Sequence, residues 1–186
     1  MGTEPPVQPP EPPTPGGQPI GPGGTTTAEW WKRLVAFLID SVIVSIPSYI
    51  VMLIFGLGFA ATAPEFEVDP NTGAIISGGS GGGFFAMIAS FLVALLVIFL
   101  LGIAYYVYLH GSRGQTVGKM AMSIKLVKEE TGELLSYGEA LIRWLVAAVL
   151  WALCYVPGIV DGLWPLWDAK DQALHDKVVK SLVIEA

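Results

Sequence analysis

The sequence is short of charge. Only 14% of its 186 residues are Asp, Glu, Lys or Arg, and 53% are hydrophobic, whereas soluble domains carry about 25% charged residues. The net charge of −6 is not offset by a concentrated basic patch, which argues against a nucleic-acid partner. This balance predicts a protein whose main partner is the lipid bilayer.

Cysteine is almost absent, and the sequence lacks the spacings of metal and catalytic sites. Cys154 is the single cysteine, so no intramolecular disulfide can form. With His110 and His175 it makes no metal-ligand pattern, and no serine occupies a Gly-x-Ser-x-Gly elbow. We therefore expect no metal, no cofactor and no enzyme activity.

A phosphate-binding loop is also excluded. Residues 114–119, Gly-Gln-Thr-Val-Gly-Lys, resemble such a loop, but Arg113 stands where its first glycine belongs. Met120 follows Lys119 where Ser or Thr would bind Mg²⁺. Nucleotide binding is not expected.

Basic residues are missing from two segments. Residues 1–28 contain no Lys or Arg and hold nine of the fourteen prolines, which predicts a disordered tail before a membrane domain at 29–186. The 61–83 loop is acidic and also lacks bases. Lys32, Arg33 and the 110–140 loop carry positive charge, so the positive-inside rule predicts a cytoplasmic amino terminus in a multi-pass protein of the bacterial inner membrane.

Three long apolar runs predict about three transmembrane helices, at about 31–59, 84–109 and 141–167, in an all-α membrane protein. The second run has no charge between Phe84 and Leu109. The third has two interpretations. It is either one full span or a helix broken at Pro157-Gly158 that returns as a re-entrant element. We favour the broken form, because a full span would carry Lys170, Lys177 and Lys180 to the outer side.

A small cytoplasmic β-structure is expected beside the helices. Residues 123–128 alternate in polarity, 129–132 read as a turn, and 133–135 complete a short hairpin. Residues 177–184 are rich in β-branched side chains, which predicts a carboxyl-terminal strand. Ser136 and Glu139 have the spacing of a capping box, so a helix should begin near Tyr137.

Arg33 and Asp40 are the most informative charges. They are seven positions apart, so they share a helix face about 10 Å apart along the axis. A carboxylate within the span costs roughly 2.5–3.5 kcal/mol unless it is paired, hydrated or protonated. We expect Arg33, Lys119 or Arg143 to pair with it.

Three segments in order resemble one family. They are residues 31–40, ending in Asp40; residues 114–120; and Asp168 followed by Gln172, Leu174, His175, Asp176 and Lys177. Together they resemble the RDD family of small bacterial membrane proteins, named for one arginine and two aspartates. Arg33 and Asp40 match the first pair, and Asp176, with Asp168 as competitor, matches the other acid. Lys180-Ser181 departs from the small residue and Thr usual there.

The resemblance implies an integral membrane protein, and transport, including cation–proton exchange, is suggested for some members. We therefore expect a proton- or cation-coupled transporter that forms homo-oligomers and handles protons or monovalent cations. The alternative is a non-transporting adaptor that recruits partners through its proline-rich tail. The candidate coupling residues are Arg33, Asp40, Asp168 and Asp176, supported by Gln115, Lys119, Arg143, Asp161 and His175.

Overall fold

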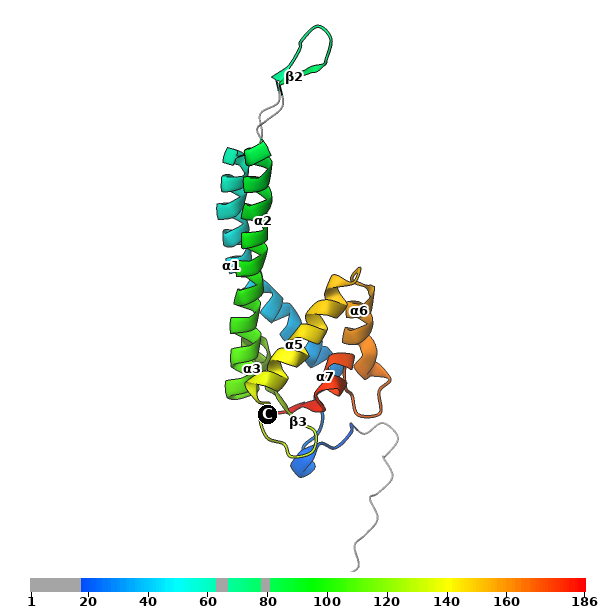
Figure 1. The fold of residues 1–186 in the computed structure, drawn as a ribbon. Helices are drawn as coiled ribbons and strands as arrows, with labels where there is room; N and C mark the ends of the chain where they lie inside the picture. Colours follow the sequence, from blue (N-terminus) through cyan, green and yellow to red (C-terminus); the bar gives the residue numbers. More distant parts are fainter. Residues whose placement is uncertain (1–17, 63–66, 78–80) are drawn as a thin grey trace, which may run out of the picture.

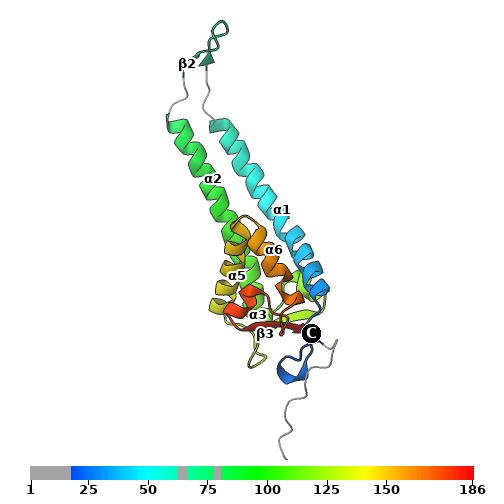
Figure 2. The ribbon, with the colours of Figure 1, turned by 90° about the vertical axis from the view of Figure 1, so that its right-hand side faces the viewer.

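The molecule has a long arm and a compact end. The computed structural model describes residues 18–62, 67–77 and 81–186. Helices α1 (Trp30–Thr62) and α2 (Gly81–Gly102) form the arm, and the short strands β1 (Glu67–Val68) and β2 (Ile75–Ser77) pair at its tip (Figures 1 and 2). The other described helices and strands gather at the opposite end.

The arm consists of two helices that are long and apolar enough to cross a membrane. The apolar stretches are Trp30–Gly58 and Gly83–Arg113, the second including a π-helical turn (Ile103–Val107) and helix α3 (Tyr108–Arg113). Leu53 and Leu57 on α1 and Phe85 on α2 are among many exposed apolar side chains. Such a surface is unfavourable in water and is typical of helices that contact lipid. The spans predicted at 31–59 and 84–109 therefore form the expected kind of helix.

The third apolar run is not a full span. It forms α5 (Tyr137–Ala152) and α6 (Val156–Leu163), which fold into a hairpin that ends part-way along the arm (Figures 1 and 2). A helix of 16 residues is about 24 Å long, less than the ~30 Å hydrocarbon core. Three complete spans at the predicted bounds are therefore not confirmed, and the broken form is the observed one.

The break lies a few residues before its predicted position. Cys154 and Tyr155 take positive φ angles of 63° and 61° and turn the chain between α5 and α6. Pro157 lies in the first turn of α6, where its missing N–H removes no helical hydrogen bond. A Cβ on Gly158 would lie 2.5 Å from the Trp151 ring, so this glycine lets α6 pack against α5.

The sheet pairs different segments from those predicted. Strand β3 (Ile124–Lys128) is antiparallel to β4 (Ser181–Glu185), with Leu126 opposite Val183. The carboxyl-terminal strand is thus confirmed, but the hairpin between 123–128 and 133–135 was wrong, because 133–135 form no strand. The β4 partner brings three buried apolar side chains, Leu182, Val183 and Ile184, whereas the expected partner begins with exposed Glu133.

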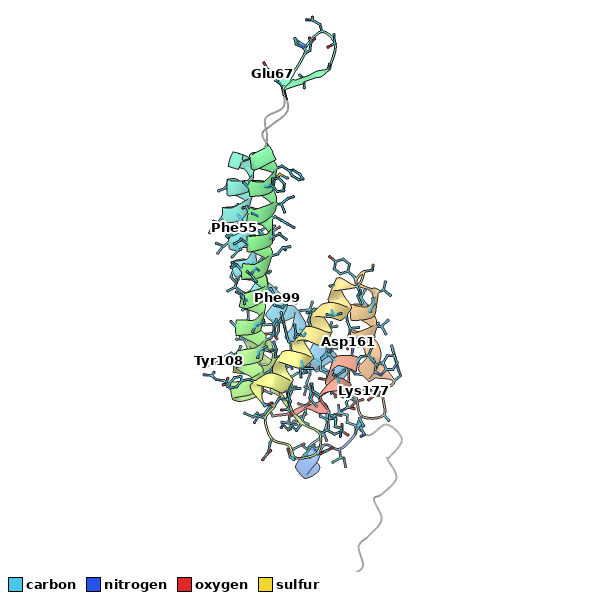
Figure 3. The ribbon with its side chains drawn as sticks, in the orientation of Figure 1. Phe55, Glu67, Phe99, Tyr108, Asp161 and Lys177 are labelled. Carbon is cyan, nitrogen blue, oxygen red and sulfur yellow. The ribbon has the colours of Figure 1, made fainter. Side chains whose placement is uncertain are left out.

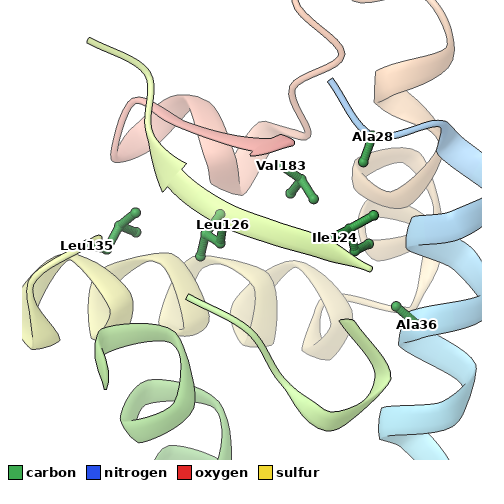
Figure 4. Packing of buried hydrophobic residues seen from close by; sticks show 6 residues of the cluster. All are labelled: Ala28, Ala36, Ile124, Leu126, Leu135 and Val183. Carbon is green, nitrogen blue, oxygen red and sulfur yellow. The ribbon is translucent and has the colours of Figure 1, made fainter. Parts of the chain in front are cut away.

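The core of the compact end lies between this sheet and the start of α1. Its buried members are Ala28, Ala36, Ile124, Leu126, Leu135 and Val183 (Figure 4). The capping box at Ser136 is present as predicted, with Glu139 accepting from the Ser136 N–H at 2.7 Å. It starts α5 directly after Leu135 and so carries that helix across the core.

The end of the proline-rich tail is folded rather than disordered. Ala28 N donates to Val183 O at 2.8 Å, Thr27 bridges Ile184, and Thr27 is buried. The disorder predicted for residues 1–28 therefore does not hold for 18–28, of which residues 26–28 lie along β4. Residues 1–17 lie outside the described residues, so the adaptor role predicted for the tail stays a prediction.

Candidate functional site

A cavity of about 380 Å³ lies in the compact end, between α1, α3, α4 (Val117–Ala121), α5, α6 and α7 (Leu174–Val178). Its apolar wall includes Phe37, Trp144 and Trp151. Figure 3 shows Asp161 between the helices of this end, while Glu67 lies at the far tip of the arm. The titratable side chains that line the cavity are Arg33, Asp40, Tyr106, His110, Lys119, Arg143, Asp161, His175 and Asp176. Residues far apart in the sequence thus line one cavity.

Asp40 is buried, with 3% of its surface exposed, and neutral donors surround it. Its Oδ1 accepts from the Tyr105 hydroxyl and from Gly118 N, both at 2.7 Å, and its Oδ2 accepts from Thr116 Oγ1 at 2.5 Å. Among the described residues no basic side chain pairs with it. The ion pair expected for Asp40 is therefore not formed, because hydrogen bonds from hydroxyl and backbone groups compensate the burial of the carboxylate instead.

Two of the donors to Asp40 come from the 114–119 motif, through Thr116 and Gly118. Thr116 caps the short helix α4 (Val117–Ala121), and Gly114 takes a left-handed φ of 69° in the turn before it. A Cβ on Gly118 would lie 2.1 Å from Ala36 O, so only glycine allows α4 to reach α1 this closely. The motif docks α4 against α1, and it places Lys119 in the cavity wall.

Gln115 has a structural position outside the cavity. Its amide donates to Ile124 O at 2.9 Å, at the start of β3. It therefore fixes the path of the chain from α4 into the sheet, and it does not line the cavity.

Arg33 binds carbonyl groups at the base of the arm. Its guanidinium donates to Ala28 O and Val183 O, each at 3.1 Å, and to Asp171 O. Its nearest carboxylate is that of Asp176, at 4.0 Å. The arginine of the family signature thus lies beside the second acid of the signature rather than the first.

Asp176 is the centre of a buried ion-pair network. Arg143 Nε donates to its Oδ1 at 2.8 Å, and Arg143 Nη2 lies at an ion-pair distance of 2.8 Å from the same oxygen. Ala173 N donates to its Oδ2 at 3.2 Å. Burial by itself would raise the pKa of Asp176, but the charges of Arg143 and Arg33 outweigh it and hold the pKa below its usual value. Asp176 is therefore an anion that locks α7 to α1 and α5.

His175 connects this network to Asp161. Its Nδ1 lies 2.5 Å from Asp161 Oδ2, and its Nε2 lies 2.8 Å from Arg143 Nη2. Because a guanidinium can only donate, Nε2 must accept, so the ring proton is on Nδ1 and points to Asp161. The order Asp161–His175–Arg143–Asp176 thus joins α6, α7 and α5 through alternating donors and acceptors.

Lys119 and His110 form a second polar pair in the cavity. Lys119 Nζ lies 3.0 Å from His110 Nε2, and His110 is only 3% exposed. Lys119 has no carboxylate within ion-pair distance among the described residues. Burial lowers the pKa of the Lys119 ammonium well below its usual value, and the charge of Arg143 lowers it further. The Lys119 ammonium therefore gives up its proton more readily than that of an ordinary, solvent-exposed lysine.

Asp168 is not part of this site. It pairs with Lys177 and accepts from Gln172 N at 3.0 Å in the loop before α7, outside the cavity wall. The structure thus selects Asp176 over Asp168 as the acid near Arg33. In the part of the chain that is described, no three His, Cys, Asp or Glu side chains are close enough to hold a metal ion.

Sequence reasoning missed His110, Tyr105 and Thr116. None of the three was among the candidate coupling residues, yet Tyr105 donates to Asp40 Oδ1 at 2.7 Å and His110 Nε2 lies 3.0 Å from Lys119 Nζ. Tyr106 and His110 are four positions apart, so they share a helix face. This spacing is the sequence signal that could have identified His110 as a cavity residue. The π-helical turn at Ile103–Val107 had no such signal, and it sets where the two tyrosines point.

The sequence is similar to one protein family and to several bacterial proteins. The sequence matches the RDD family over residues 27–180. It is 28% identical to the "Uncharacterized protein YxaI" of Bacillus subtilis (strain 168), over 84% of this chain and 96% of YxaI. It is 30% identical to the proline-rich antigen homolog of Mycobacterium tuberculosis (strain ATCC 25618 / H37Rv), over 83% of this chain and 62% of that protein.

The proline-rich antigen of Mycobacterium leprae (strain TN) is 27% identical, over 83% of this chain and 59% of that protein. This chain thus spans about three fifths of the length of the mycobacterial relatives. No solved structure matches the chain significantly. Because the family match covers most of the sequence, including Arg33, Asp40 and Asp176, this protein belongs to the RDD family.

Proposed function

We propose that this protein is a small proton-coupled membrane transporter that handles its proton at Lys119 and His110, next to Asp40. The observation that carries the proposal is the cavity of about 380 Å³ at the base of two long apolar helices, with acidic and basic groups from six helices in its wall. Ionisable groups within a membrane domain are costly, and they commonly mark the path of an ion or a proton.

A proton fits the site better than a metal cation. A cation bound by Asp40 would have to displace donors that already satisfy both carboxylate oxygens. Asp176 is likewise occupied by Arg143. Lys119, in contrast, changes charge by gaining or losing a proton without losing a partner, since neutral and charged amines can both donate to His110. Asp40 then positions the helix that carries Lys119.

Proton flux in proteoliposomes tests this function. An imposed pH gradient should drive proton movement through the wild-type protein, and Lys119→Met should reduce it to the level of empty liposomes, because Met fills a similar volume but cannot be protonated. Asp40→Asn should also lower the flux, since its amide would present a donor to Gly118 N or Thr116. The matched control is Lys125→Met on β3, outside the cavity. Equal flux from all four proteins would refute the proposal.

We also propose that the compact end faces the cytoplasm. All ten Lys and Arg residues fall outside residues 34–112, and they belong to the elements of this end. Because Thr27 bridges Ile184, the amino-terminal segment and β4 must lie on one side. Reporters fused to either terminus should both be active in the cytoplasm. Activity of both outside would contradict the orientation, and activity on opposite sides would contradict the fold.

A further inference from the structure

The cavity wall contains hydrogen-bond donors without acceptors. His110 Nδ1 is buried and has no partner. When Lys119 is charged, its ammonium can only donate to His110 Nε2, so Nδ1 carries the ring proton and is a donor. Buried donors without a hydrogen-bond partner are rare, and such a donor is stabilised when an acceptor binds to it. The histidine is more than nine-tenths buried, and its ring lines the cavity.

Two neighbouring groups have further unused donors. Lys119 Nζ has one polar partner, His110, among the residues that the structure describes. Arg143 uses Nε and Nη2 for Asp176 and His175, while Nη1 has no hydrogen bond to the described residues. The carboxylates of Asp40, Asp161 and Asp176 each accept at least two hydrogen bonds. The wall therefore has unused N–H donors, which a ligand with a hydrogen-bond acceptor would satisfy.

The rest of the wall suits an apolar body. Phe37 from α1 stacks on Trp151 from α5 with ring centroids 5.7 Å apart, and Trp144 lies on the same helix as Trp151. Flat rings of this kind favour an aromatic or other apolar group. A volume of about 380 Å³ falls in the range of small-molecule sites, roughly 300–1,000 Å³.

The charges of the wall decide when an anion can enter. With Lys119 protonated, the three bases Arg33, Lys119 and Arg143 balance the three acids Asp40, Asp161 and Asp176. With Lys119 neutral, the wall has an excess negative charge that repels an anion. The charged or titratable groups that face Lys119 are Arg33 and Asp40 on α1, His110 on α3, Arg143 on α5 and Asp176 on α7.

We propose that the cavity binds a small organic carboxylate with an apolar, aromatic body. Its carboxylate accepts from Lys119 Nζ and His110 Nδ1, and its ring lies against Trp144 and Trp151. Lys119 takes up one proton from solution when the anion binds, so the two are carried together. The inference deepens the proposed function, on which it rests for the role of Lys119, by assigning the class of molecule that moves with the proton.

Isothermal titration of the purified full chain in detergent tests the site without any gradient. Benzoate should bind, and benzyl alcohol should bind roughly 10- to 100-fold more weakly, which corresponds to the loss of charge-assisted hydrogen bonds. Benzylamine should not bind. The affinity for benzoate should fall as the pH rises, because Lys119 must be protonated. Titrations in buffers of different ionisation enthalpy should show proton uptake.

Two variants locate the binding. Lys119→Met should abolish both the binding of benzoate and its pH dependence, and His110→Phe should weaken binding roughly tenfold. Lys125→Met should match the wild type. The titrations of the wild-type protein decide the inference by themselves, even if a variant fails to fold. Absence of benzoate binding, or stronger binding of benzylamine than of benzoate, would overturn it. Benzoate binding without proton flux would contradict only the transport function, whereas flux without benzoate binding would contradict only this ligand.

Discussion

Asp176→Asn is expected to destabilise the protein by about 3–5 kcal/mol, the cost of removing one partner of a buried ion pair. The substitution keeps the size of the side chain but leaves Arg143 and Arg33 without their carboxylate. Its new amide N–H₂ would also face donors such as Ala173 N–H. Folded domains are typically stable by only 5–15 kcal/mol. Thermal unfolding in detergent, followed by tryptophan fluorescence, should therefore show a large fall in Tm.

The matched control is Glu130→Gln, which removes an exposed ion pair to Lys180. Exposed pairs contribute about 0–1 kcal/mol, so its Tm should stay close to that of the wild type. Because the pKa of Asp176 is lowered, its stabilisation is present above the ordinary carboxyl pKa of about 4 and is lost as the pH falls through the lowered value. A wild-type Tm for Asp176→Asn would show that the network does not hold α7.

Gly118→Ala should be the second most damaging change. The added Cβ would lie 2.1 Å from Ala36 O and 2.9 Å from Asp40 Oδ1. Since the first of these atoms is backbone, α4 has to move away from α1, and the hydrogen bonds of Asp40 to Thr116 and Gly118 are lost with it. Overpacking of this kind costs about 1–3 kcal/mol, and the unpaired carboxylate adds to that cost.

Gly138→Ala is the control for this glycine. Gly138 is exposed in the first turn of α5, and a Cβ there meets no atom within 4 Å. Alanine is the better helix former by up to about 1 kcal/mol, so the Tm should be unchanged or higher. If both alanine variants unfolded at the same temperature as the wild type, the close packing of α4 on α1 would be disproved.

The elements with strong local signals were predicted well. The spans at 31–59 and 84–109 were visible because the chain there is almost free of charge, and lipid contact requires that composition whatever the tertiary fold. The capping box at Ser136 was visible because its two partners lie within one turn. The hairpin at 123–135 failed because strand pairing depends on which distant segment buries more apolar surface, and β4 lies more than 50 residues away in the sequence.

The sequence by itself determined which groups would have to be buried and at which end of the molecule they would gather. Arg33, Asp40 and Arg143 lie in the apolar runs near the ends that carry the basic residues, and Lys119 and Asp176 lie in the polar segments that follow the second and third runs. Only the tertiary structure decided which acid faces which base. Arg33 and Asp40 share a helix face but lie about two turns apart, so each reaches a different neighbour, Asp176 for the first and Thr116 with Gly118 for the second. Partner choice among buried polar groups depends on the positions of whole helices, and short-range sequence spacing does not contain that information.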